Sequence, residues 1–178
     1  MIKNNKDSNN VEEKRIIYIH NQIDEDLHHD VAKKILSFDM NLKSPITVHI
    51  NSPGGDVYEA MGILDLLRGT DCPIHTVCTG KAMSAAVPIL ASGEKGFRRA
   101  GALSTIMIHE VSLASWGKLY EFKNEAKEAE RLQNIMLELL SNYTGLQKLK
   151  LKKIFDTHID TYISPNEAKK IGLIDDIF

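Results

Sequence analysis

Short apolar runs alternate with amphipathic segments through most of the 178-residue chain. Residues 15–23 are rich in β-branched and aromatic side chains, which predicts a strand, and residues 24–38 then carry apolar side chains at helical spacing. The same reasoning predicts three further strands, in the segments 44–55, 73–80 and 104–110. We expect the first of these three to stop at its Pro-Gly-Gly turn.

Four more segments have the pattern of helices: 56–69, 82–92, 118–143 and 164–172. The third is long and amphipathic, with apolar residues three and four positions apart. The last has the clearest start signal, because Ser164 suits the N-cap, Pro165 the first helical position and Glu167 the capping box. Gly172 is expected to end that helix.

Strands that alternate with helices in this way predict an α/β fold with a largely parallel sheet and helices on its faces. The length fits one domain. We expect a flexible N-terminal tail over residues 1–14 and a single domain over 15–178, because no repeat, low-complexity block or linker divides the chain.

Composition and charge exclude several classes of protein. A net charge of −2 and a pI near 6.4 provide no basic surface for nucleic acid. Cys72 and Cys78 match neither a zinc-site spacing nor a disulfide framework, which predicts free thiols and no metal. We find neither a signal peptide nor a membrane-spanning run, so a cytoplasmic location is expected.

Two strand ends carry the residues that could do chemistry. The turns after the second and third strands should lie at the same edge of a parallel sheet, where ligands bind. Ser84 is expected in the first turn of the helix that follows, where free N–H groups favour a nucleophilic oxygen. His109 ends the fourth strand and could act as its base. Locally, each residue also suits a purely structural role.

A serine nucleophile also needs an orienting acid and donors for an oxyanion. Asp156 and Asp160 both precede the last helix, and spacing alone does not choose between them. Gly54 and Gly55 offer backbone N–H groups with no side chain in the way. The four elements together favour acyl transfer more strongly than any one does.

Three long motifs give the chain its resemblance to a known family. They are INSPGGDVYEAMGILDLLR, GKAMSAAVPILASGEKGFRRAGALSTIMIHE and DTHIDTYISPNEAKKIGLID, and they occur in this order between about Arg15 and Asp176. Together they resemble the ClpP proteolytic subunits, the serine peptidases of ATP-dependent proteolysis. The resemblance implies a crotonase-like α/β fold with a head domain and a protruding handle at about 110–143, formed by the long helix and the strand before it.

Motif by motif, the resemblance assigns roles to five residues. Ser84 matches the nucleophile, His109 the base and Asp160, rather than Asp156, the orienting acid. Gly55 and Ala85 match the two oxyanion-hole amides. The implied activity is endopeptidase hydrolysis of unfolded proteins or peptides, with no cofactor. The implied assembly is a homo-oligomer of two stacked seven-membered rings, with an AAA+ unfoldase as a candidate partner.

Some features of the sequence allow other interpretations of its function. Pro88 departs from the family pattern and predicts a kink one turn past Ser84. Lys81 could serve as the base of a Ser-Lys hydrolase on the same fold. A non-catalytic ring subunit and a phage-type protease are the remaining alternatives.

Overall fold

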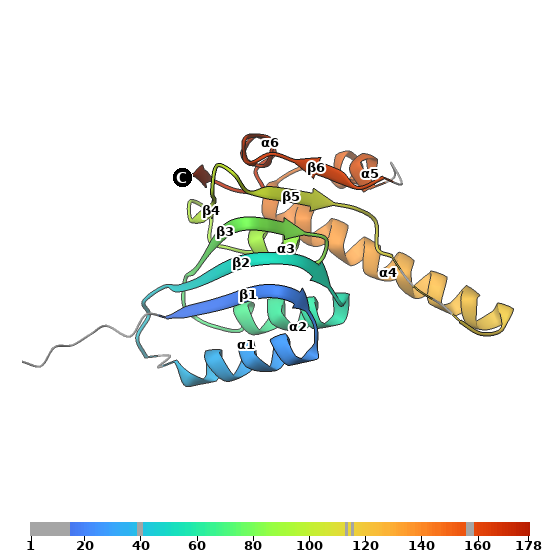
Figure 1. Cartoon of the computed structure of the whole chain (residues 1–178), viewed down its shortest axis with the longest axis horizontal. Coiled ribbons are helices and arrows are strands. Elements are labelled where there is room, and N and C mark those ends of the chain that lie inside the picture. Colours follow the sequence, from blue (N-terminus) through green and yellow to red (C-terminus); the bar gives the residue numbers. More distant parts are fainter. Residues whose placement is uncertain (1–14, 39–40, 113, 115, 156–158) are drawn as a thin grey trace, which may run out of the picture.

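In the described part of the chain, a seven-stranded sheet forms the centre of the protein, with helices packed along one of its faces (Figure 1). This computed structural model describes residues 15–38, 41–112, 114, 116–155 and 159–178. The predicted tail over 1–14 lies outside the described residues.

The first half of the chain alternates strands and helices, as predicted. Its elements are β1 (Ile16–Ile23), α1 (Glu25–Ser37), β2 (Ile46–Gly55), α2 (Val57–Arg68), β3 (Ile74–Met83) and α3 (Ala86–Ala91). The second half contains β4 (Arg98–Ala100), β5 (Thr105–Ile108), α4 (Leu119–Thr144), α5 (Lys148–Phe155), β6 (Thr161–Ile163), α6 (Pro165–Lys170) and β7 (Asp176–Ile177). The sequence pattern had not predicted β4, α5, β6 or β7.

The sheet is largely parallel, which confirms the predicted α/β class. The strand order is β1-β2-β3-β4-β7, and β5 continues beside β3 beyond the end of β4. Among the described strands, β6 alone runs antiparallel, and it pairs with β5. This pairing brings a late segment of the chain to the edge of the sheet where β3 and β5 end.

The core lies between the sheet and helices α1 to α3. Alternate residues of the first two strands point into it and are at most 2% exposed: Ile17, Ile19, Ile46, Val48 and Ile50. The other side of this half of the sheet is more open than predicted, since Tyr18 is 55% exposed. Helices therefore cover β1 and β2 on one face only.

Two strands run further than the sequence predicted. β2 continues through the Pro-Gly-Gly turn, because Gly55 still pairs with Ile23 of β1. β3 continues to Met83, because residues 81–83 pair with residues 105–107 of β5. Both extensions depend on a neighbouring strand, which local sequence does not reveal.

Helix α4 extends away from the sheet (Figure 1). Its last turns are packed against the core through Met136 and Leu140, whereas Leu119 near its start is 73% exposed. The strand expected before this helix is not found among the described residues between β5 and α4. No strand in the described part of the chain pairs with this segment, and the N–H of Val111 instead donates to the side chain of Gln133.

The caps of α6 confirm the predicted boundary. Ser164 is the N-cap, its N–H donates to Glu167 Oε2 at 2.8 Å, and the N–H of Glu167 donates back to Ser164 Oγ at 3.3 Å. Gly172 follows the helix with φ of 77°. In the described ranges, no helix is both long and apolar enough to cross a membrane.

Candidate active site

Ser84 occupies a sharp turn between β3 and α3. Its backbone is left-handed, with φ of 52°, which is rare for a residue other than glycine. Its N–H donates to the carbonyl of Met107 in β5 at 2.9 Å. The hydrogen bonding between β3 and β5 thus extends to Ser84, just before the helix begins. A residue with a strained backbone at such a position is typical of a functional site.

This geometry corrects the predicted start of the helix. Ser84 precedes α3, whose N-cap is Ala85, and therefore does not lie in its first turn. The sequence also predicted a kink at Pro88, but α3 continues without interruption to Ala91. Pro88 falls within the first turn of α3, where its missing N–H has no intrahelical acceptor to lose, and its carbonyl still accepts from Ser92 at 2.9 Å.

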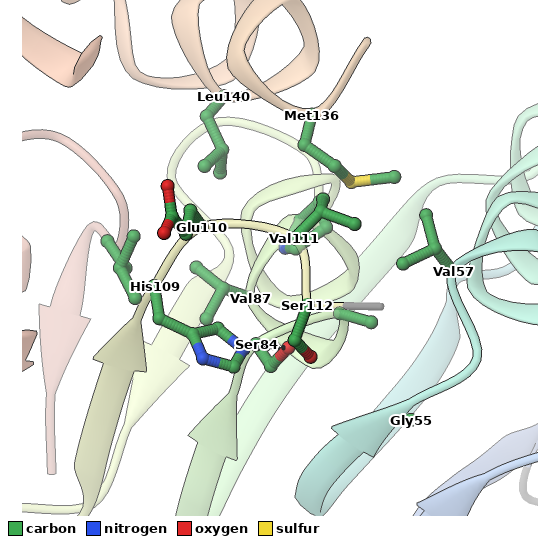
Figure 2. Close-up of a pocket in the computed structure, with 13 residues that line it drawn as sticks. Gly55, Val57, Ser84, Val87, His109, Glu110, Val111, Ser112, Met136 and Leu140 are labelled. Atoms are coloured by element: carbon green, nitrogen blue, oxygen red, sulfur yellow. Dashed lines mark hydrogen bonds between the residues drawn. The ribbon is translucent and has the colours of Figure 1, made fainter. Parts of the chain in front are cut away.

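His109 follows the last residue of β5 and reaches the hydroxyl of Ser84. The distance from His109 Nε2 to Ser84 Oγ is 2.6 Å (Figure 2). The pairing of β3 with β5 explains the contact, because it places the two strand ends side by side. A serine in hydrogen-bond contact with an imidazole can be activated as a nucleophile.

Asp160 approaches the other nitrogen of the same ring. Its Oδ1 lies 3.3 Å from His109 Nδ1, and its side chain is half exposed. The antiparallel pair of Ile108 with Thr161 brings the two residues together, since His109 directly follows Ile108 and Asp160 directly precedes Thr161. Asp156, the other acid that the sequence offered, lies outside the described residues.

The glycine turn packs directly against Ser84. Gly54 has φ of 89°, and a Cβ at this position would lie 2.6 Å from Met83 O and 2.8 Å from Ser84 Cβ. Only glycine fits such an approach. The N–H of Gly54 donates to Ser52, which leaves Gly55 as the glycine whose N–H could face a substrate.

Ala85 is the second residue matched to an oxyanion amide. It directly follows Ser84 and lines the same pocket as Gly55. Among the described residues, no protein acceptor takes up its N–H. The structure therefore brings both backbone positions to one pocket beside the serine.

A pocket of about 60 Å³ opens beside Ser84 and His109 (Figure 2). Apolar side chains from four parts of the chain make up much of its wall: Val57, Val87, Ile108, Val111, Met136 and Leu140. The two residues from α4 were not predicted, because nothing in the spacing of that helix relates it to Ser84. The pocket suits an apolar side chain of a substrate.

Other candidate groups are less well placed for chemistry. Lys81 lies within β3, and no hydrogen bond joins it to Ser84 in the described part of the chain. Burial raises the pKa of the Cys78 thiol to about 11, so this thiol stays protonated near neutral pH. Within the described residues, no three His, Cys, Asp or Glu side chains gather to hold a metal ion.

Comparison with known proteins agrees with the motifs. The family model for Clp protease matches residues 3–178. The ATP-dependent Clp protease proteolytic subunit of Deinococcus radiodurans is 34% identical over 164 residues, which cover 92% of this chain and 79% of the relative. Subunit 2 of Mycobacterium leprae is 34% identical over 179 residues, covering 99% and 83%. The chain therefore belongs to the Clp protease family and is a Clp-type peptidase.

Proposed function

We propose that this protein is a serine endopeptidase in which Ser84 is the nucleophile, His109 the general base and Asp160 the orienting acid. The observation that carries the proposal is the 2.6 Å contact between His109 Nε2 and Ser84 Oγ. It favours His109 over Lys81 as the base. The 3.3 Å approach of Asp160 to the opposite ring nitrogen supports the third role, since such contacts often shorten when substrate binds.

In the first half of the reaction, Ser84 Oγ attacks the carbonyl carbon of a peptide bond while its proton passes to His109 Nε2. The carbonyl oxygen becomes an oxyanion, which the N–H groups of Gly55 and Ala85 stabilise. The carboxylate of Asp160 stabilises the imidazolium. The C–N bond then breaks, the leaving amine takes the proton from His109, and an ester with Ser84 remains.

Water completes the cycle. His109 takes a proton from a water molecule, whose oxygen attacks the ester carbon through a second tetrahedral intermediate. The intermediate collapses, His109 returns the proton to Ser84 Oγ, and the new carboxyl terminus leaves. Every proton transfer in this scheme uses groups of the chain itself, and no step calls for a cofactor.

The apolar pocket and the family together suggest the substrates and the assembly. We infer that unfolded proteins and peptides are cleaved after apolar residues that fit between Val87 and Met136. The named relatives are proteolytic subunits of an ATP-dependent protease, which supports an oligomer that works with an ATPase. From the family resemblance we infer a homo-oligomer of two stacked seven-membered rings in the cytoplasm, with an AAA+ unfoldase as a candidate partner. In this assembly, residues 15–178 form one domain whose handle, about 110–143, joins the rings.

Purified protein tests the proposal directly. We expect a fluorophosphonate probe to label it stoichiometrically, and a fluorogenic peptide with leucine before the scissile bond to be hydrolysed without added metal. The measurements are intact mass after labelling and the initial rate of hydrolysis. A folded, oligomeric protein that is neither labelled nor active would contradict the proposal and favour a non-catalytic ring subunit.

Asp160→Asn should distinguish the two acids that the sequence offered. The amide cannot hold the imidazole in the correct tautomer or stabilise its charged form, so we expect kcat to fall by about 10²- to 10⁴-fold with little change in KM. Asp156→Asn is the matched control and should leave kcat within about twofold. The opposite ranking of the two variants in steady-state kinetics would assign the role to Asp156.

A further inference from the structure

Ser52 lies in β2 immediately before the glycine turn, and its side chain is completely buried. Its hydroxyl donates a hydrogen bond to the carbonyl oxygen of Asn21 in β1, at 2.5 Å. The same oxygen accepts a hydrogen bond from the N–H of Gly54, at 3.0 Å. One buried hydroxyl therefore joins the neighbouring strand to the turn that faces Ser84.

The strands depart from regular pairing at this level. In β1 the register shifts between His20 and Gln22, and Asn21 between them is left-handed with φ of 64°. In β2 the register with β3 shifts between Ile50 and Ser52. Irregularities of this kind interrupt the backbone ladder and redirect the chain. Ser52 supplies hydrogen bonds at the interruption and so defines the direction in which β2 leaves the sheet.

The glycine turn lies close to Ser84 on one side and to β1 on the other. On one side, a Cβ on Gly54 would collide with the backbone of Met83 and the side chain of Ser84. On the other side, Gly55 pairs with Ile23 of β1, and a Cβ on Gly55 would collide with the backbone of Ile23. An oxyanion donor works only when its N–H is about 3 Å from the developing charge and aimed at it. A small rotation of the turn would therefore move the Gly55 N–H out of place.

We propose that Ser52 is a positioning residue for hydrolysis, which holds the glycine turn so that the Gly55 N–H faces the oxyanion formed at Ser84. This inference rests on the proposed function. Ser52 touches no substrate atom in this role and acts through Gly54. Loss of its hydroxyl would leave the Asn21 carbonyl and the Gly54 N–H without their buried partner, and the turn would relax to satisfy them elsewhere.

Ser52→Ala tests the inference by removing the hydroxyl at minimal change in volume. We expect kcat for the leucine peptide to fall about 10- to 100-fold while KM stays within about twofold, because the donor acts mainly on the transition state. A peptide boronate forms a tetrahedral adduct with an active serine, and its inhibition constant should rise by about the same factor as kcat/KM falls. Ser52→Thr, which keeps the hydroxyl, should retain more of kcat than Ser52→Ala.

Ser104→Ala is the matched control. Ser104 is 6% exposed, and its hydroxyl donates to the carbonyl of Cys78 at 3.1 Å, away from the glycine turn. Ser104→Ala should lower the melting temperature by about as much as Ser52→Ala does. It should leave both kcat and the inhibition constant of the peptide boronate unchanged. If Ser52→Ala does not fold, Ser52→Cys takes its place, since a thiol is only a weak hydrogen-bonding group.

The outcomes separate this inference from the function on which it rests. Equal losses of kcat in the Ser52 and Ser104 variants, or an effect of Ser52→Ala on KM alone, would show that Ser52 only stabilises the fold and would overturn the inference. In both cases the wild-type protein still hydrolyses the peptide. A wild-type protein that neither reacts with fluorophosphonate nor hydrolyses peptides would overturn the proposed function, and this inference with it.

Discussion

Ser84→Ala is expected to lower kcat for peptide hydrolysis by about 10⁴- to 10⁶-fold and to abolish fluorophosphonate labelling. The hydroxyl is the group within 2.6 Å of His109 Nε2, and alanine leaves the imidazole with no nucleophile to activate. KM should change little, because the methyl side chain leaves the pocket walls in place. The left-handed backbone at this position is strained to a similar degree for serine and for alanine. The substitution therefore adds little strain, and we expect the variant to fold.

The measurement is a single-turnover assay together with mass spectrometry of the labelled protein. Ser92→Ala is the control at the other end of α3, where the hydroxyl donates to the carbonyl of Ile89 at 2.8 Å. It should react with the probe at the wild-type rate. Residual activity above about one part in 10³ of wild type in Ser84→Ala would place the nucleophile elsewhere.

Arg98→Met is expected to destabilise the protein by about 3 kcal/mol, because it leaves the Asp175 carboxylate without its cation. The two side chains are only 4% and 17% exposed, and Arg98 Nη2 lies 2.6 Å from Asp175 Oδ1. Arg98 Nη1 also donates to the carbonyl of Tyr143, at 2.9 Å, near the end of α4. One side chain thus ties β4, α4 and the segment before β7 together.

Urea unfolding at a fixed protein concentration measures this loss. Arg99→Met is the matched control, because Arg99 and Asp176 are 47% and 52% exposed, with 3.7 Å between their charged atoms. Its cost should stay within about 1 kcal/mol. Similar losses of unfolding free energy in both variants would show that the buried ion pair contributes no more to stability than the exposed one.

Acid stability offers a second readout of the same pair. The hydrogen bond from the Arg98 side chain, with help from nearby backbone N–H groups, lowers the pKa of Asp175 from 3.8 to about 2. The resulting stabilisation, about 1–2 kcal/mol after solvent screening, is complete above the unfolded pKa and is lost as the pH falls through about 2. In Arg98→Met this acid-sensitive contribution should largely disappear.

Long periodic segments made much of the fold predictable. The pattern located β1, α1, α2 and α4 closely, and the capping residues Ser164 and Glu167 located the start of α6. The strands that the pattern missed have only two or three residues. So few residues carry no measurable alternation, and such strands exist because a neighbour pairs with them.

The candidate site was predictable as a set of residues but not as a geometry. Motif resemblance named Ser84, His109 and Asp160, and the structure brings them within hydrogen-bond or ion-pair distance. The left-handed turn at Ser84 had no local signal, because its stretch lacks the spacing of the familiar nucleophile elbow. The pocket residues Met136 and Leu140 were also missed, because the packing of α4 places them there.

The sequence by itself determined the α/β class, the capped start of α6 and the residues available for chemistry, because each depends on neighbours a few positions away. The tertiary structure alone decided where β2 and β3 end, and so where Ser84 and Gly54 meet. It also decided that Asp160 reaches His109, through the pairing of β5 with β6. Contacts of this kind depend on strand register, and register is set by packing across the whole sheet.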